Sequence, residues 1–279
     1  METLACVNGR ILPAQERCVS PLDRGLQYGV GLFETLAVTD GRILFVREHL
    51  ARLESGMAQL GIELGRHAGR LQEYLEMGRQ ANAIHRGSLR LTVTAGPAGC
   101  EGCAIVTPGP PPYGADCYRQ GIRVGMCKVR RNPHSPIVRL KTLNYLDSLL
   151  GRQDARSNGW DEGILLNTEG AVAEGTASNV FLVHKGRLFT PHADCGLLPG
   201  IVRHIVLQAA GFLGIDVVEG CFGATALADA DEIFLTNSLM GVMPVSLFNG
   251  RPVGVSVPGP VTALLMDAYE RRARLNCAL

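Results

Sequence analysis

The stretch Arg139-Leu-Lys141-Thr-Leu-Asn-Tyr-Leu146 places one lysine between an extended segment and a helical pattern. Pro133 and Pro136 favour extended conformations in the residues before them, so the segment that precedes the lysine is not expected to be helical. After the lysine, apolar residues recur at helical spacing, at Leu143, Leu146, Leu149 and Leu150. This pattern predicts a helix whose leucine face is buried and which begins beside Lys141. An ordinary solvated lysine at a helix start would look the same, so the pattern alone assigns no chemistry.

A proline-rich tract, Pro108-Gly-Pro-Pro-Pro112, lies upstream of the lysine. Such a tract joins neither a helix nor a strand ladder and is locally stiff, which makes it the best candidate for a domain linker. We therefore predict domains over residues 1–112 and 113–279. Strands and helices are mixed in both without strict alternation, which indicates an α+β protein.

The first half contains well-marked elements. Asn8-Gly9 predicts the turn of a hairpin over residues 4–12. The glycine-rich stretch over residues 20–31 reads as a turn or as a ligand loop, and it precedes a strand, so it does not fit the dinucleotide-binding pattern. The other predicted elements are strands over residues 33–38, 89–95 and 104–107, and helices over residues 46–60 and 66–84.

In the second half, Pro199-Gly200 predicts the start of a helix over residues 201–212. The first backbone N–H groups of that helix, near Ile201 and Val202, would suit an anion, although a simple strand-to-helix turn has the same pattern. The remaining predictions are a helix over residues 261–275 and strands over residues 121–129, 161–166, 171–184, 188–190, 215–219, 232–236 and 242–248.

Composition excludes several classes of function. A net charge of +1 and a pI near 7.6 give no electrostatic case for nucleic acid or an anionic membrane. No apolar run is long enough to span a membrane and the N-terminus lacks signal-peptide features, so we expect a cytoplasmic protein. The nine cysteines are scattered and odd in number, which suits reduced thiols. Cys100-Glu-Gly-Cys103 is a lone CxxC pair, for which we expect loop thiols and no metal.

Three elements offer complementary chemistry: the amine of Lys141, the carboxylate of Glu174 in a strand of small residues, and the helix start at Gly200. A ligand with an aldehyde, a ring nitrogen and a phosphate would need such a set. The pattern itself shows no cofactor.

At these same residues the chain resembles the class IV aminotransferase family, the fold-type IV pyridoxal-phosphate enzymes. The motifs that carry the resemblance span nearly the whole chain: Asp23-Arg-Gly-Leu-Gln-Tyr-Gly29, Gly31-Leu-Phe-Glu-Thr35, His49-Leu-Ala-Arg52-Leu53, Lys141-Thr-Leu-Asn-Tyr-Leu146, Val172-Ala-Glu174-Gly-Thr-Ala-Ser-Asn179, Leu198-Pro-Gly200-Ile-Val-Arg203 and Asp231-Glu-Ile-Phe-Leu-Thr-Asn-Ser238. The resemblance implies a smaller N-terminal α/β domain, a larger C-terminal β-barrel-like domain with helices that binds pyridoxal 5'-phosphate, and a homodimer.

The resemblance also implies roles for single residues. Lys141 matches the lysine that binds the cofactor covalently and shuttles protons. Glu174 matches the carboxylate that keeps the pyridine nitrogen protonated. The phosphate group would be bound by the Arg52 side chain, the amides of Ile201 and Val202, and the Ser238 hydroxyl. Tyr145 is near the tyrosine that contacts the phenolic oxygen of the cofactor in some members, in an alignment with a one-residue gap.

Within the family, Thr236-Asn-Ser238-Leu-Met-Gly-Val-Met-Pro-Val245 and Gly31-Leu-Phe-Glu-Thr35 look more like the lyase branch, where a threonine like Thr35 assists proton transfer. This implies conversion of 4-amino-4-deoxychorismate to 4-aminobenzoate and pyruvate in folate biosynthesis. Candidates for the substrate carboxylates are Arg130, Arg131 and Arg139, some of which could instead be solvated loop arginines. Val30 departs from the family pattern, because aspartate is common there.

Two rival functions remain. An aminotransferase acting on branched-chain or D-amino acids would use the same lysine and cofactor with a 2-oxo acid acceptor. The segment Thr94-Ala-Gly-Pro lacks the Arg-x-His carboxylate trap of the best-known D-specific enzymes. A non-catalytic binding protein of this fold would need neither Lys141 nor Glu174, so both residues argue against it.

Overall fold

The computed structural model describes residues 2–16, 18–111 and 113–276. The chain forms two compact units, each described by itself below. The first comprises Met1–Pro112, Leu140–Asn144 and Leu275–Leu279, and the second comprises Tyr113–Arg139 and Tyr145–Arg274. The structure therefore differs from the expectation that residues 113–279 form a single domain, because the lysine segment belongs to the first unit. Pro112 of the predicted linker and Cys277 lie outside the described residues.

The first unit is built on a six-stranded sheet with the order β2-β1-β6-β5-β3-β4. Its strands are β1 (Leu4–Val7), β2 (Arg10–Pro13), β3 (Gly31–Thr39), β4 (Arg42–Ile43), β5 (Gly87–Thr94) and β6 (Cys103–Pro108). Its helices are α1 (Arg24–Tyr28), α2 (Val46–Leu60), the 3-10 helix η1 (Gly65–Arg70) and α3 (Leu71–Ala81). The hairpin with Asn8 and Gly9 in its turn is confirmed, with both residues at positive φ.

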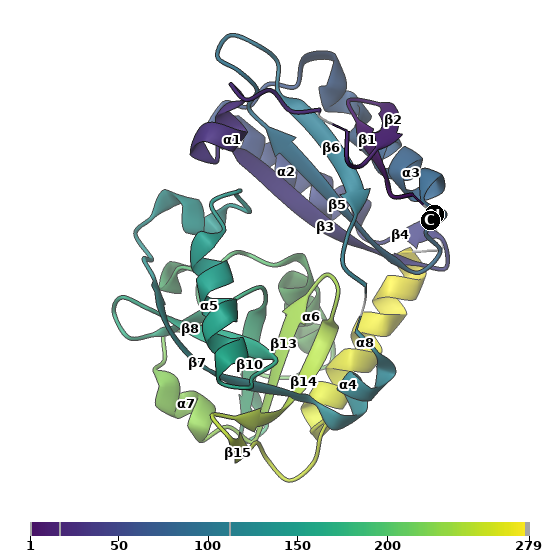
Figure 1. Cartoon of the computed structure of the whole chain (residues 1–279). Helices are drawn as coiled ribbons and strands as arrows, with labels where there is room; N and C mark the ends of the chain where they lie inside the picture. Colours follow the sequence, from purple (N-terminus) through teal and green to yellow (C-terminus); the bar gives the residue numbers. More distant parts are fainter. Residues whose placement is uncertain (1, 17, 112, 277–279) are drawn as a thin grey trace. The chain divides into compact units, whose positions relative to one another are not determined.

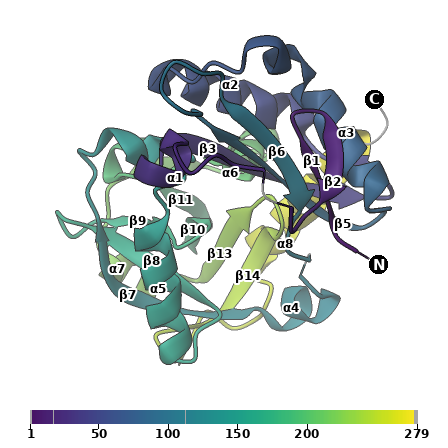
Figure 2. The ribbon, with the colours of Figure 1, turned by 45° about the horizontal axis from the view of Figure 1, so that its top comes forward.

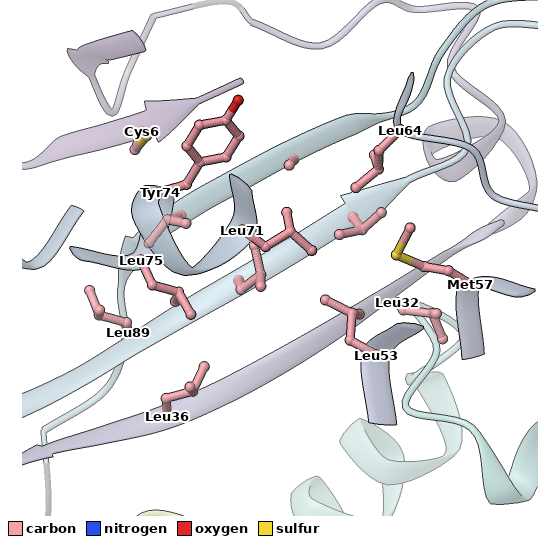
Figure 3. Close-up of a cluster of buried hydrophobic side chains, with 14 of the residues drawn as sticks. Cys6, Leu32, Leu36, Leu53, Met57, Leu64, Leu71, Tyr74, Leu75 and Leu89 are labelled. Atoms are coloured by element: carbon pink, nitrogen blue, oxygen red, sulfur yellow. The ribbon is translucent and has the colours of Figure 1, made fainter. Parts of the chain in front are cut away.

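The core of this unit lies between the sheet and helices α2 and α3 (Figure 3). Leu53 and Met57 of α2 pack with Leu32 and Leu36 of β3 in a single buried cluster. The predicted helix over residues 46–60 is confirmed. The predicted helix over residues 66–84 is instead a 3-10 turn followed by α3, which ends at Ala81.

The glycine-rich stretch contains a short helix that the sequence did not predict. Asp23 caps α1 by accepting a hydrogen bond from the Gly25 amide at 2.7 Å, and its other oxygen accepts one from the Thr94 hydroxyl at 2.7 Å. Gly29 ends the helix in the left-handed region, where glycine carries no steric penalty. This geometry turns the chain sharply into β3.

The lysine segment is fastened to the start of β3. The Phe33 amide donates to the Lys141 carbonyl, and the Leu143 amide donates to the Gly31 carbonyl, each at 2.9 Å. Leu32 and Thr142 form an isolated antiparallel bridge. The prediction that a helix begins beside Lys141 is therefore wrong, because backbone pairing with β3 holds the lysine in an extended segment. Helix α5 begins only at Leu146.

The second unit contains a nine-stranded sheet that curls around its core (Figures 1 and 2). The sheet has the order β12-β11-β10-β13-β14-β7-β8-β9, with β15 paired to β14. Its strands are β7 (Ile122–Arg131), β8 (Glu162–Asn167), β9 (Val172–Gly175), β10 (Asn179–His184), β11 (Arg187–Pro191), β12 (Val217–Gly220), β13 (Glu232–Asn237), β14 (Gly241–Phe248) and β15 (Arg251–Pro252). Its helices are α4 (Ala115–Gln120), η2 (Pro136–Arg139), α5 (Leu146–Ser157), η3 (Ala193–Cys195), α6 (Ile201–Phe212), α7 (Ala224–Ala228) and α8 (Pro260–Asn276), whose last residues belong to the first unit.

Two predictions for this unit need correction. The strand predicted over residues 171–184 is two strands, because the Gly175 amide bonds to the Ser178 carbonyl at 2.7 Å and turns the chain. Helix α5 does not bury its leucines, since Leu146 and Leu149 are 65% and 55% exposed. Its buried face carries the small residues Ser148, Gly151 and Ala155, which let the helix lie close to β7 and β8.

The predicted helix over residues 201–212 is confirmed. Its apolar face packs on β10 and β13 in a cluster that includes Val202, Val206 and the stacked pair Phe181 and Phe234. Among the described residues, no helix combines the length and apolar character that a membrane span requires.

A buried ionic cluster lies on the α2 side of β3 in the first unit. Arg52 donates to both Glu34 oxygens, at 2.8 and 2.6 Å, and His49 Nδ1 lies 2.7 Å from Oε2. Burial alone would raise the pKa of Glu34, but the Arg52 charge and the hydrogen bonds from His49 and Arg52 outweigh it and lower the pKa to about 2. Burial lowers the pKa of His49, so this ring is neutral and donates from Nδ1.

We expect Gly31→Ala to destabilise the protein. A Cβ atom at this position would lie 2.6 Å from the Val93 carbonyl oxygen and 2.5 Å from Leu143 Cδ1, so the sheet and the lysine segment would have to move apart. Overpacking of this kind costs about 1–3 kcal/mol. Urea unfolding measures the cost, and faster hydrogen exchange at the Leu143 amide would locate it. Gly69→Ala is the control, since its Cβ would meet no atom within 4 Å. Equal stability of the two variants would contradict the proposed constraint.

We expect Glu34→Gln to lower the free energy of unfolding at pH 7 by about 3 kcal/mol, because it removes a charge whose pKa falls from 4.5 to about 2 on folding. A depressed folded-state pKa stabilises the protein above pH 4.5, and this stabilisation is lost as the pH falls toward 2. The variant should therefore lose stability less steeply than the native protein in acid.

Urea unfolding between pH 7 and pH values of about 2 measures both effects. Glu73→Gln is the control. It removes a carboxylate that is also paired with an arginine, Arg70, but on the surface, so it should change stability little. An acid dependence that is the same for Glu34→Gln and the native protein would contradict the assignment.

Candidate active site

Lys141 lies over an aromatic ring in the first unit. Its Nζ is 4.5 Å from the centroid of the Phe33 ring, and the Arg90 guanidinium is 3.7 Å from the same centroid. Thr35 follows Phe33 by two residues, so both side chains lie on the same face of β3, and Thr35 is half-buried opposite Arg90. The structure thus places the Lys141 amine over Phe33, on the strand face that also carries Thr35, the second predicted catalytic residue.

Arg52, the predicted phosphate ligand, also belongs to the first unit. Its guanidinium is held by the buried carboxylate of Glu34, and its side chain remains 18% exposed. A guanidinium group that is already held by two hydrogen bonds loses little conformational freedom when it binds an anion. The Glu34 and His49 partners were missed in the sequence, although Glu34 lies within one quoted motif and His49 begins another.

Glu174 is a buried carboxylate on β9 of the second unit. It is 5% exposed, and Arg131 Nε donates to its Oε1 at 3.1 Å. The Leu198 amide donates to its Oε2 at 3.1 Å. Arg131 in turn donates to the Ser148 hydroxyl of α5 at 2.9 Å. The carboxylate is therefore held by a cation and by the loop that precedes α6.

These contacts bear on the arginines predicted to bind substrate. Arg131 is engaged with Glu174, so it is better placed to support that carboxylate than to bind a substrate. Arg139 is half-exposed and pairs with Asp194 at 2.7 Å. Arg130 is exposed near the end of β7.

Tyr145 lies beside the same carboxylate. Its hydroxyl donates to the Thr176 carbonyl at 3.2 Å, and burial, together with the nearby charges of Glu174 and Glu162, raises its pKa. Glu162 accepts hydrogen bonds from the amide and the hydroxyl of Thr176, and burial raises the pKa of Glu162. The sequence did not predict Glu162 or Ser148 as supporting residues, because neither has a local signal.

The start of α6 is capped by a glycine. Gly200 is the N-cap, and in the described part of the chain no side chain caps this helix. Asn179 fixes the preceding loop through a 2.9 Å bond from its amide nitrogen to the Leu198 carbonyl. A Cβ atom at Gly200 would lie 2.0 Å from Asn179 Oδ1, so only glycine fits there. The N–H groups of Ile201 and Val202 are thereby presented at the positive end of the helix dipole.

Ser238 lies at the same end of the sheet. It follows β13, whose Thr236 pairs with Asn179 of β10, the residue that fixes the loop before α6. The turn after β13 is held by Asn237 Oδ1, which accepts bonds from the Leu239 and Met240 amides. In the second unit, Glu174 and the α6 start therefore share one loop, Gly196–Gly200, while Tyr145 lies beside Glu174 and Ser238 follows the strand that pairs with Asn179.

Comparisons with known proteins agree with this chemistry. The profile of the family described as Amino-transferase class IV matches residues 31–248. A Methanocaldococcus jannaschii protein named after the branched-chain-amino-acid aminotransferases is 33% identical over 275 residues, covering 95% of this chain and 94% of that protein. An aminodeoxychorismate lyase of Bacillus subtilis is 31% identical over 281 residues, covering 96% and 94%.

A solved structure is also similar over the whole chain. The branched-chain amino acid aminotransferase of Escherichia coli has a TM-score of 0.90 and 28% identity, covering 98% of this chain and 95% of that one. Another branched-chain amino acid aminotransferase, solved with pyridoxamine 5'-phosphate, has a TM-score of 0.89 and 27% identity over 99% and 95% of the two chains. The buried carboxylate and the glycine-capped helix described above fit the nitrogen and the phosphate of such a group. The chain belongs to the class IV aminotransferase family, whose cofactor is pyridoxal 5'-phosphate.

Proposed function

We propose that this protein is a lyase that converts 4-amino-4-deoxychorismate to 4-aminobenzoate and pyruvate. The observation that carries the proposal is that the lyase-like motif Gly31-Leu-Phe-Glu-Thr35 is hydrogen-bonded to the lysine segment, with the Lys141 amine over Phe33 of that motif. The similarity to the B. subtilis aminodeoxychorismate lyase over 96% of the chain supports it.

The residues that would hold the cofactor are those that the family resemblance implies. When bound, pyridoxal phosphate supplies an aldehyde that bonds to amines and a ring that withdraws electrons. Lys141 would attach to the aldehyde. The phosphate would be bound by Arg52, the Ile201 and Val202 amides, and the Ser238 hydroxyl. Tyr145 would donate to the phenolic oxygen.

Glu174 would hold a proton on the ring nitrogen. Its carboxylate is buried, and an unpaired charge in the interior would be costly. The hydrogen bonds from Arg131 and the Leu198 amide stabilise the charged form of the carboxylate and hold it in position. The Leu198 amide also links Glu174 to the phosphate end, because Leu198 belongs to the loop that leads into α6. One loop thus supports two of the proposed cofactor contacts.

Proton transfer at the substrate would belong to Lys141 and Thr35. The Lys141 amine would remove the proton at C4 of the substrate ring, and Lys141 or Thr35 would protonate the departing enolpyruvate. The product ring becomes aromatic, which drives the elimination. The substrate carries two carboxylates, for which Arg130 and Arg139 remain the candidates, Arg131 being bound to Glu174.

An aminotransferase of branched-chain or D-amino acids is the alternative. It is favoured by the 33% identity to the M. jannaschii protein and by the similarity to the E. coli enzyme. Such an enzyme would return the proton to the cofactor carbon and would need a 2-oxo acid, whereas the lyase needs no acceptor.

We expect the purified protein, reconstituted with pyridoxal phosphate, to release 4-aminobenzoate and pyruvate in equal amounts from 4-amino-4-deoxychorismate without a 2-oxo acid. Fluorescence of 4-aminobenzoate and an enzymatic pyruvate assay measure the two products. Lys141→Ala should abolish turnover, whereas Thr35→Ala should slow it about 100-fold and Thr35→Ser should retain most of it. Absence of both products, with 2-oxo-acid-dependent conversion of leucine or D-alanine, would instead establish an aminotransferase.

We further propose a homodimer in which α5 contributes to the contact. The outward face of α5 carries Leu146, Leu149 and Leu150, all exposed in the single chain. A cluster of exposed leucines on one helix is costly in water and marks an interaction surface. The expected partner is a second copy of the chain, as the family resemblance implies.

Leu149→Glu should therefore convert a dimer to a monomer, because burying an unpaired carboxylate in an apolar contact is unfavourable. Sedimentation at several protein concentrations measures the oligomeric state. Leu264→Glu is the matched control, because Leu264 of α8 is similarly exposed, at 49%, and lies outside the α5 face. A dimer that survives Leu149→Glu unchanged would exclude α5 from the contact.

A further inference from the structure

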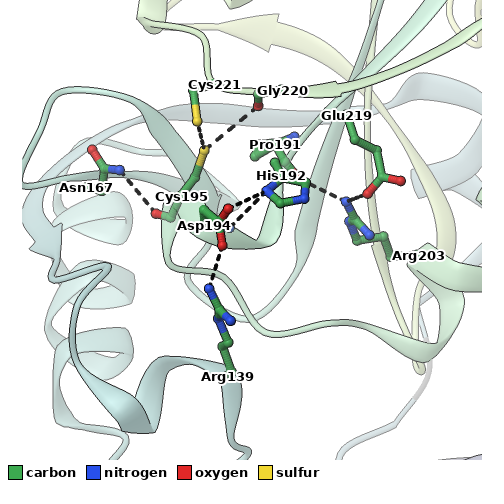
Figure 4. A network of polar contacts seen from close by, with 10 residues as sticks. All are labelled: Arg139, Asn167, Pro191, His192, Asp194, Cys195, Arg203, Glu219, Gly220 and Cys221. Carbon is green, nitrogen blue, oxygen red and sulfur yellow. Dashed lines mark hydrogen bonds and ion pairs between the residues drawn. The ribbon is translucent and has the colours of Figure 1, made fainter.

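Two cysteines lie at the ends of neighbouring parallel strands of the second unit (Figure 4). The parallel pairing of β11 with β12 ends at Pro191 and Gly220. The His192 amide extends it with a 3.0 Å hydrogen bond to the Gly220 carbonyl. Cys221 follows β12 directly, and Cys195 ends the short helix η3 after β11. Backbone hydrogen bonds therefore set the distance between the two chain segments.

The two sulfur atoms are in direct contact. Cys195 Sγ lies 2.9 Å from Cys221 Sγ and 3.8 Å from the Gly220 carbonyl oxygen. A disulfide bond is about 2.05 Å long, so the thiols need to approach by only about 1 Å. Cys195 is fully buried, whereas Cys221 is exposed. The pair thus combines one thiol that solutes can reach with one that they cannot.

We propose that Cys195 and Cys221 form a reversible intramolecular disulfide by exchange with a small-molecule disulfide such as glutathione disulfide. The Cys221 thiolate attacks one sulfur of the small disulfide, forms a mixed disulfide and releases the first small thiolate. The Cys195 sulfur then attacks Cys221 Sγ and expels the second small thiolate, which takes up the Cys195 proton. The two protein thiols lose two electrons in total, and one small disulfide is reduced to two thiols.

The environments of the sulfurs give this order of events. Burial, and next the hydrogen bond with Cys221, raise the pKa of Cys195 to about 12, so Cys195 is a poor first nucleophile toward a solute. Its contact with Cys221 removes the need for diffusion in the second step. Cys221 is the accessible partner and meets the oxidant first.

The cross-link would close a loop that contains the whole of α6. Arg203 of this helix already donates to the Pro191 carbonyl at 2.9 Å and pairs with Glu219, the residues at the ends of β11 and β12 (Figure 4). The carbonyl of Cys195 itself accepts a bond from the Asn167 amide at 3.2 Å. Because the native contacts already hold both ends, the bond would restrain the unfolded chain and strain the native one little.

In the test, the whole chain with its cofactor bound is incubated with glutathione disulfide. The remaining thiols are then alkylated, and the peptides are mapped by mass spectrometry without reduction. We expect a peptide that joins Cys195 to Cys221, a loss of two alkylated thiols, and full reversal by dithiothreitol. The apparent Tm should rise by about 5 °C in the oxidised protein. Cys100→Ser, which removes another exposed thiol, should leave the cross-link intact.

Variants of the pair separate the two steps. Cys221→Ser should abolish the cross-link and leave Cys195 unmodified, whereas Cys195→Ser should accumulate a glutathione adduct on Cys221. The native protein alone suffices if the Cys195 variant does not fold. A stable glutathione adduct on Cys221 of the native protein, or cross-links made only by other cysteines, would overturn the proposal, as would an unchanged Tm.

Discussion

The position of Lys141 depends on the backbone hydrogen bonds between residues 141–143 and the start of β3. They take Lys141 out of the helix that follows it in sequence and fix it over Phe33, on the strand face that also carries Thr35. Glycine is needed at position 31, because a Cβ atom there would clash with the Val93 carbonyl oxygen of β5 and with the Leu143 side chain. The opposite face of the same strand carries Glu34, which anchors Arg52. One strand therefore orders an amine on one side and a guanidinium on the other.

A loop has the corresponding role in the second unit. The residues between η3 and α6 donate to Glu174 through Leu198, accept from Asn179 through the same residue, and end at the glycine that opens the helix. The Glu174 carboxylate and the start of α6 are thus linked by one hydrogen bond and the short stretch Leu198–Gly200. Rigid coupling of this kind suits a ligand whose basic nitrogen and phosphate are a fixed distance apart.

Local signals in the sequence predicted local structure well. Pro199-Gly200 marked the first residue of α6, and Asn8-Gly9 marked the first hairpin. The helical spacing of the leucines predicted α5 but assigned the wrong face to the core. Leucine spacing alone does not distinguish a buried face from an outward apolar face, and in α5 the small residues pack against the sheet. The pairing of Lys141 with β3 joins residues about a hundred positions apart, and no local pattern reports it. Motif resemblance named Arg52 and Glu174, whereas the contacts that hold them, from Glu34 and from Arg131, became visible only in three dimensions.

The route of the chain also limits how the protein can be divided. Residues 140–144 belong to the first unit although the residues on both sides belong to the second, and the end of α8 returns to the first unit, where Asn276 accepts a bond from the Phe45 amide at 2.7 Å. A gene fragment that stops at the proline tract would lack both returning pieces and would leave the start of β3 without its partner. The two units are therefore not exchangeable modules, and recombination between relatives would have to carry the lysine segment together with the N-terminal half.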